Sequence, residues 1–139
     1  MIDTSVPLEK INEISRNNML SHLGIEIIGL GQDYLIGSMP VDHRTQQPMG
    51  LLHGGATATL IETLGSLGSS LLVDLSKFNV VGIEINVNHI RGVKSGFVSA
   101  KAVILHEGRK THIWQVDVKD DTQKLIATGR LTVMVIDKK

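Results

Sequence analysis

The sequence contains no cysteine, which excludes disulfides, thiol catalysis and zinc–thiolate sites together. Aromatic residues make up only 3% of the chain, too few for the stacking surfaces that bind single-stranded nucleic acid. Neither sign of charge dominates, because 14 basic residues balance 14 acidic ones. A broad nucleic-acid or membrane-binding surface is therefore not expected.

Targeting and metal-binding signals are also missing. The N-terminal residues show neither the basic start nor the apolar run of a signal peptide, so we expect a cytoplasmic protein. The apolar segment after Leu51 carries threonines, serines and one glutamate, which would be costly against lipid. Six histidines are present, but none has the spacing of a metal-binding motif, and we expect neither a metal nor a cofactor.

The pattern of apolar residues predicts one α+β domain over residues 1–139, in which a curved antiparallel sheet wraps a central helix. A short amphipathic helix is expected from Pro7 to about Leu20, with Ser5 as its cap. Runs rich in Val, Ile and Thr predict six strands: Ile25–Leu30, Tyr34–Pro40, Val80–Ile90, Phe97–Leu105, Thr111–Val118 and Leu125–Ile136. The two free edges of such a sheet favour dimerisation.

The central helix is predicted over a proline-free segment of about five turns, from Gly54 to Val73, in which Glu62 is the only ionisable residue. A carboxylate inside a buried helix is costly unless it is paired, so Glu62 is a candidate reactive group. Its own face of the helix carries small residues, and the opposite face carries a leucine stripe suited to packing on a sheet. The small residues are Gly55, Ala58, Thr59, Gly65, Ser66 and Ser69, and the leucines are Leu60, Leu64, Leu67 and Leu71. An alternative is that the small face only packs against another helix.

Polar residues stand just before this helix. The N–H groups of Gly54 and Gly55 would point out of its N-terminus, where a carbonyl oxygen under attack would be stabilised. Gln47 can donate a further hydrogen bond, while His53 has the alternative role of a helix-start residue bonded to backbone. Nine positions separate His53 from Glu62, which puts them on opposite sides of the helix and about 13 Å apart along its axis. A site that uses both must draw them from two chains.

Several segments together resemble a known family. They are Gln47–Ala56 with Glu62–Ser66, then Val81–Arg91, and finally His112–Gln115. These segments are similar to the hotdog-fold acyl-CoA thioesterases of the phenylacetate and 4-hydroxybenzoyl type. The closest likeness is to bacterial enzymes that act on 1,4-dihydroxy-2-naphthoyl-CoA and on aryl-carrier-protein thioesters. It covers roughly residues 25–135, nearly all of the chain.

The resemblance implies a hotdog fold and active sites shared between subunits of a homo-oligomer, expected to be a dimer of dimers. It implies that Glu62 is the nucleophile or general base, facing Gln47 and His53 of another chain. Gly54 would bind the oxyanion with help from Gln47, and His53 would orient the thioester. Ser66 would position water or the acyl group.

The resemblance also implies where the nucleotide end of CoA lies. The residues are Gly82, His89, Ile90, Arg91, Gly92, His106, Gly108, Arg109, Lys110 and Thr111. Their basic side chains suit phosphates, although Glu107 places an acid in the same turn, and His89 and Arg91 have the alternative of being ordinary strand residues. For the wall around the acyl group we expect Met49, Ser66, Leu67 and Val73.

The expected function is hydrolysis of acyl-CoA thioesters with aryl or bulky acyl groups, such as 1,4-dihydroxy-2-naphthoyl-CoA or phenylacetyl-CoA. Benzoyl and medium-chain acyl groups and carrier-protein thioesters stay open. One competing function is a hotdog enoyl-CoA hydratase or dehydratase, which would need an Asp–His pair near the helix start, whereas Asp42 and His43 lie before Gln47. The other is a non-catalytic acyl-CoA binding protein, for which a buried Glu62 would be unnecessary.

Overall fold

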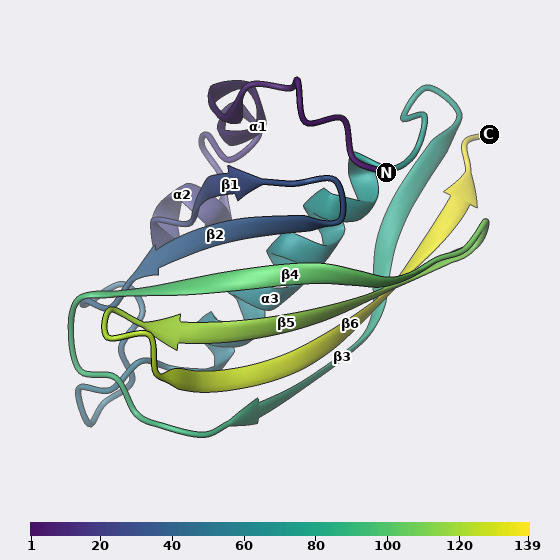
Figure 1. The fold of residues 1–139 in the computed structure, drawn as a ribbon. Coiled ribbons are helices and arrows are strands. Elements are labelled where there is room, and N and C mark those ends of the chain that lie inside the picture. Colours follow the sequence, from purple (N-terminus) through teal and green to yellow (C-terminus); the bar gives the residue numbers. More distant parts are fainter.

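A computed structural model describes all 139 residues. Six strands form one antiparallel sheet in the order β1-β2-β4-β5-β6-β3, which curves around the long helix α3 (Figure 1). The elements are α1 (Leu8–Glu13), α2 (Met19–Leu23), β1 (Glu26–Leu30), β2 (Tyr34–Pro40), α3 (Gly54–Ser70), β3 (Phe78–His89), β4 (Phe97–Glu107), β5 (Thr111–Asp120) and β6 (Leu125–Asp137). The predicted α+β plan, a curved sheet around a central helix, is confirmed.

The core lies between α3 and the concave face of the sheet. Leu60, Ile61 and Leu64 of the helix are fully buried there. They pack within one hydrophobic cluster that includes Trp114 and Leu131 of the facing strands. Because alternate strand residues point to the same face, this burial fixes which side of each strand meets the helix.

The buried side of α3 is wider than the leucine stripe. Gly65 and Ser69, expected on the small exposed face, instead face the sheet, where the indole N–H of Trp114 donates to Ser69 Oγ at 2.9 Å. A β-carbon on Gly65 would lie 3.3 Å from Trp114 Cδ1. Leu131, whose Cδ2 would be the nearest atom to that β-carbon, and the indole of Trp114 therefore need small residues opposite them. These two positions serve packing rather than ligand approach.

The predicted N-terminal helix is wrong in extent, because the segment forms two short helices. Asn17 adopts a left-handed backbone conformation with φ of 58°, which breaks the helix. Asn18 then caps α2 in a reciprocal pair of hydrogen bonds with Ser21. Ser5 does not cap α1 either, since its backbone N–H and its hydroxyl both donate to Asp3.

The two edge strands of the sheet, β1 and β3, differ in how far they are covered. At the β1 edge, the Asn12 side chain from α1 accepts from the Ile27 N–H at 2.8 Å and donates to the Ile27 carbonyl at 2.9 Å. At the β3 edge, Val81, Ile83 and Ile85 are exposed by 42%, 51% and 36%. Asn12 therefore satisfies the backbone of β1 at Ile27, whereas the β3 edge has no such cover from within the chain.

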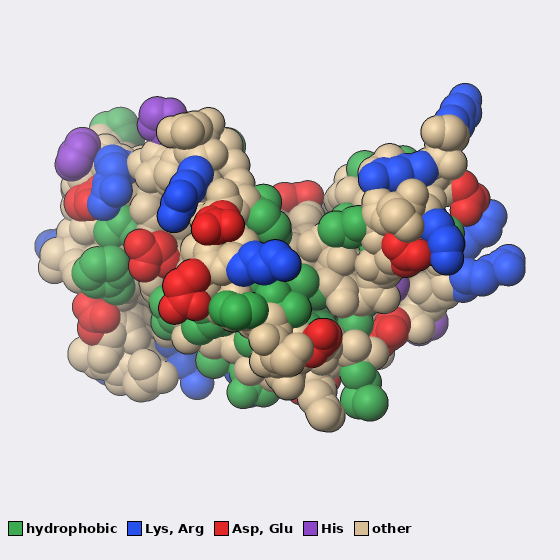
Figure 2. All heavy atoms as spheres, turned by 90° about the horizontal axis from the view of Figure 1, so that it is seen from above, with side chains coloured by type: hydrophobic (Ala, Val, Ile, Leu, Met, Phe, Trp, Pro, Cys, Tyr) green, Lys and Arg blue, Asp and Glu red, His purple; other side chains and the backbone are tan.

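The outer surface carries both signs of charge. Seen from above, lysine and arginine side chains alternate with acidic ones, and no single sign covers the face (Figure 2). This agrees with the balanced composition of the chain. None of the helices combines the length and the apolar character that crossing a membrane would need.

Candidate active site

The N-terminus of α3 presents one free backbone donor. His53 is the N-cap, and its Nδ1 accepts a hydrogen bond from the Gly55 N–H at 2.8 Å. In the neutral ring the proton is therefore on Nε2, which is left to donate. Ala56 and Thr57 donate back to the His53 carbonyl, so the Gly54 N–H is the first-turn donor without a partner in the chain. The predicted donor pair at Gly54 and Gly55 is thus reduced to Gly54.

A tight loop holds Gln47 beside this helix start. Its backbone N–H donates to the Leu51 carbonyl at 2.8 Å, and its carbonyl accepts from Gly50 at 2.9 Å. The side-chain Oε1 accepts from the backbone N–H of Met49. The amide NH₂ of Gln47 therefore stays available as a donor.

Six of the predicted site residues line one cavity of about 320 Å³ at this end of the molecule: Gln47, Gly54, His89, Ile90, Arg91 and Gly92. His89, expected to contact the nucleotide of CoA, lies against the helix start within this chain. A β-carbon on Gly54 would be 2.9 Å from His89 Nε2. A larger residue at position 54 would therefore displace the imidazole of His89.

The loop after β3 is anchored to β6. The N–H groups of Ile90 and Arg91 both donate to the Ile126 carbonyl, at 2.7 and 3.1 Å. The Arg91 guanidinium also donates to the Leu125 carbonyl at 3.0 Å, so it is partly engaged within the chain and less free for phosphate than expected. Sequence reasoning missed four other residues of the cavity, which lack any chemical signal in the sequence: Leu51, Leu52, Thr57 and Ile126.

Glu62 is outside this cavity. Its carboxyl is half-buried and has no charged partner, and burial raises its pKa above the ordinary value of 4.5. It lies over Gly82 of β3, where a β-carbon would be 3.0 Å from the Glu62 carboxyl carbon. Ser66, one turn further along α3, is also half-buried. One chain therefore does not bring Glu62 together with Gln47 and His53.

The remaining predicted CoA contacts lie at the opposite end of the sheet. The hairpin between β4 and β5 is at one end and the C-terminal end of β3 at the other (Figure 1). Through the pairing of Thr111 with Met134 and of Met134 with Val81, the hairpin is level with the start of β3, roughly 25 Å from His89. The expected CoA site is thus split into two groups within one chain.

A second cavity of about 320 Å³ lies beside this hairpin, lined by Leu72, Val73, Asp74, Phe78, Glu107, Gly108, Arg109, His112 and Val135. His112 is buried, its Nδ1 has no hydrogen-bond partner, and burial lowers its pKa. The predicted acyl wall is also divided, because Val73 lines this cavity whereas Met49 is 79% exposed beside Gln47.

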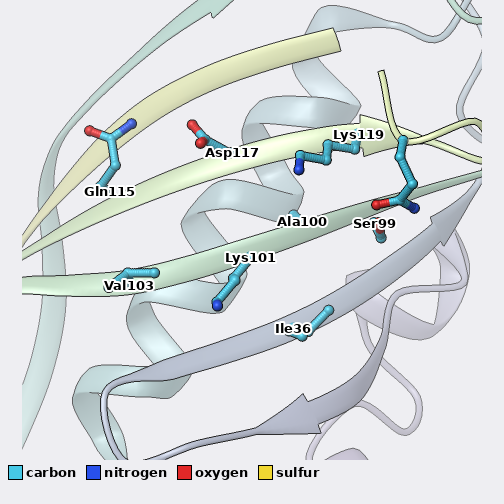
Figure 3. A pocket seen from close by; sticks show the side chains of 9 residues that line it. Ile36, Ser99, Ala100, Lys101, Val103, Gln115, Asp117 and Lys119 are labelled. Carbon is cyan, nitrogen blue, oxygen red and sulfur yellow. The ribbon is translucent and has the colours of Figure 1, made fainter. Parts of the chain in front are cut away.

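The convex face of the sheet has a hollow of about 240 Å³ over β2, β4 and β5 (Figure 3). Lys101, Asp117 and Lys119 point into it, and it contains no predicted site residue. Asp117 accepts a hydrogen bond from Thr128, which in turn accepts from Gln115. No three His, Asp or Glu side chains anywhere in the structure lie close enough to hold a metal ion.

A curved antiparallel sheet around one helix, with a free N–H at the helix start and a lone carboxylate within the helix, is the arrangement of a hotdog-fold thioesterase. The sequence profile of the Thioesterase superfamily matches residues 49–127. The chain therefore belongs to this family and is a thioester hydrolase.

Similar proteins agree with this assignment. A mutant thioesterase from Pseudomonas aeruginosa superimposes with a TM-score of 0.96 at 42% identity, over 99% of each chain. A thioesterase from Haemophilus influenzae gives a TM-score of 0.93 at 45% identity, over 98% of this chain and 94% of that one. The 1,4-dihydroxy-2-naphthoyl-CoA hydrolase of Escherichia coli is 39% identical, over 94% of this chain and 96% of that protein.

Proposed function

We propose that this protein is a cytoplasmic enzyme that hydrolyses acyl-CoA thioesters with aryl or otherwise bulky acyl groups, such as 1,4-dihydroxy-2-naphthoyl or phenylacetyl. The observation that carries the proposal is Glu62, a half-buried carboxylate with no charged partner in a helix that has no other ionisable residue. The likeness to a naphthoyl-CoA hydrolase along nearly the whole chain supports the aryl class. No cofactor is required, because a carboxylate and water suffice for hydrolysis.

The residues take the following roles. Glu62 either attacks the thioester carbonyl or removes a proton from the attacking water. Negative charge then develops on the carbonyl oxygen, where the Gly54 N–H and the Gln47 NH₂ are the free donors. His53 donates from Nε2 to hold the thioester, and Ser66 positions water or the acyl group. The carbon–sulfur bond breaks and the CoA thiolate leaves. If Glu62 acts as the base, the thiolate takes up the proton that Glu62 removed from water, and the free acid is released. If Glu62 attacks, water then hydrolyses the acyl–Glu62 anhydride and supplies the proton that the thiolate takes up.

The site is completed by a second copy of the chain. The β3 edge exposes apolar residues and unpaired backbone groups, which suit pairing with another strand. Antiparallel pairing of β3 with its copy brings the His89 end of one strand beside the Gly82 end of the other. Glu62 lies over Gly82, and the Gly54 cavity adjoins His89, so this pairing joins the carboxylate of one chain to the oxyanion donors of the other.

The same pairing accounts for the division of the CoA-binding residues. The 89–92 loop of one chain would approach the start of β3 in the other, the end of the sheet at which the 106–111 hairpin lies. Arg109 and Lys110 in that hairpin form no ion pair within the chain and suit the phosphates of CoA. Two such dimers would then form the proposed tetramer.

The hydratase or dehydratase alternative is disfavoured by the residues it would need. Asp42 is held by Arg44, whose Nη2 lies 2.7 Å from Asp42 Oδ2, and this pairing holds the pKa of Asp42 at about 2. His43 Nδ1 is 4.0 Å from Asp42, and its side chain is 88% exposed. Because Asp42 is ion-paired with Arg44 at the surface, it is not placed to act as the base of an Asp–His pair at the helix start.

The test is a panel of acyl-CoAs with naphthoyl, benzoyl, phenylacetyl and medium-chain groups, read as release of free thiol and compared as kcat/KM. The same panel on Glu62→Gln separates an enzyme from a binding protein. We expect the highest kcat/KM for an aryl acyl group and loss of turnover with the variant. Binding of acyl-CoA without thiol release would overturn hydrolysis, and release only from the corresponding carrier-protein thioesters would overturn the CoA assignment.

A further inference from the structure

Strand β3 contains one residue without a partner in β6. Gly82 pairs with Val133 and Glu84 pairs with Thr132, so Ile83 is an extra residue that forms a β-bulge. Bulges re-aim the side chains that follow them and are common beside active sites.

The bulge decides which residues of β3 face α3. Paired residues of antiparallel strands share a face, and Val133, Leu131 and Ala127 of β6 are all buried against the helix. Their partners Gly82, Ile85 and His89 therefore also face the helix side. Gly82 and His89 are seven positions apart, and in a regular strand an odd separation would put them on opposite faces. Only the bulge brings both onto one face.

At Gly82 the missing side chain makes room for Glu62. A β-carbon there would lie 3.0 Å from the Glu62 carboxyl carbon and closer still to its Oε1. No hydrogen bond or ion pair fixes the carboxylate, so packing against the backbone of β3 is its direct constraint.

The geometry points to Gly82 as a positioning residue for Glu62, presented to the helix by the bulge at Ile83. This role differs from the contact with CoA that the family resemblance implies for Gly82, and it rests on the proposed function of Glu62. The backbone of β3 at Gly82 contacts the Glu62 carboxylate and sets how far the carboxylate lies from this strand. In the proposed dimer, the same strand pairs with the second copy.

The first test is Gly82→Ala, assayed with an acyl-CoA that the parent hydrolyses. We expect kcat to fall about 10- to 100-fold, because a displacement of about 1 Å of a catalytic group costs about 10² in rate. KM should change less than about threefold. Gly29→Ala is the matched control, since Gly29, like Gly82, is next to an irregular pairing in a strand and a β-carbon there meets only Ile36, at 3.3 Å. Unchanged kcat in Gly82→Ala would overturn the inference.

A double-mutant cycle separates positioning from a general structural effect. Glu62→Asp withdraws the carboxylate by about one methylene, away from the space that a methyl at position 82 would fill. In the Gly82→Ala background this second change should therefore cost at least about threefold less than it does in the parent. Effects that simply multiply would contradict a direct contact between the two residues.

A third measurement needs no substrate. The ¹³C resonance of the Glu62 side-chain carboxyl, followed through a pH titration, should change in Gly82→Ala and stay as in the parent in Gly29→Ala. A changed resonance in Gly82→Ala supports the positioning role even if no acyl-CoA is hydrolysed. The measurement therefore distinguishes failure of the proposed function from failure of this inference. An unchanged resonance and titration overturn the role even in an active enzyme.

Discussion

Glu62 has surroundings that favour reactivity over stability. It is half-buried, and desolvation alone raises its pKa, with no partner to offset the cost of the charge. A carboxyl kept in such a place is typical of a group that does chemistry, because selection for stability alone would favour an uncharged residue.

Replacing this carboxylate should separate chemistry from binding. We expect Glu62→Gln to lower kcat by about 10² to 10⁴, with more loss if attack is covalent, while the affinity for CoA stays close to that of the parent. The amide keeps the size of the side chain, so α3 should remain packed. Steady-state kinetics with a product-binding titration checks both parts, and near-parent kcat would refute a catalytic role.

The same substitution should change stability in a pH-dependent way. Folding raises the pKa of Glu62 above its value in the unfolded chain. The protonated carboxyl therefore contributes its full stability at pH values below the unfolded pKa. This contribution is lost as the pH rises through the folded pKa. Glu62→Gln should therefore have a higher Tm than the parent near pH 7, and the difference should vanish below about pH 4. Thermal melts across this range measure it; a Tm advantage that grows on acidification has the wrong sign.

At the scale of the element, His53 caps the helix and is proposed to hold the substrate as well. Its Nδ1 caps α3 through Gly55, which leaves Nε2 for a ligand. His53→Ala should lose both roles, with about 1 kcal/mol of unfolding free energy and a clear drop in kcat. His53→Asn should restore the cap, since asparagine is a preferred N-cap, without restoring kcat. Denaturant unfolding and kinetics on the two variants test this; recovery of kcat by asparagine would reduce His53 to a cap.

Helix α1 protects the β1 edge of the sheet through a single side chain. Asn12→Ala removes two hydrogen bonds to the Ile27 backbone and should destabilise the fold by about 1–3 kcal/mol. The opened edge should also increase aggregation, as measured by light scattering. Gln32→Ala, a change at an exposed loop residue, is the control. Equal light scattering from Asn12→Ala and Gln32→Ala would show that the Asn12 side chain is not needed to protect the β1 edge.

At the scale of the whole molecule, the proposed dimer requires that one chain supply two half-sites at different places along β3. Mixing His53→Ala with Glu62→Gln and allowing subunits to exchange should recover about a quarter of the parent activity, since half of the dimers are mixed and each has one intact site of two. Mixing His53→Ala with Gln47→Ala should recover none, because both changes damage the same half-site. Sedimentation should show at least a dimer, and a fully active monomer would contradict the shared site.

Much of this architecture could be predicted from local signals. The helix start at His53–Gly54, the isolation of Glu62 and the four long strands follow from capping, glycine and alternation of apolar residues, which act within a few positions along the chain. The break between α1 and α2 was missed because the apolar residues Leu8, Ile11, Ile14 and Leu20 lie on both sides of it, and nothing in their spacing marks the turn at Asn17.

The sequence by itself determined the α+β plan, the family and the opposed directions of His53 and Glu62, because these depend on residue type and helical period. Tertiary structure alone decided the bulge at Ile83, the cover over β1 and the burial of Gly65 and Ser69 under Trp114. Each of these depends on the register between strands distant in sequence or on the volume that one side chain leaves for another. Neither quantity is encoded in a local pattern, and both are set only when the sheet closes around the helix.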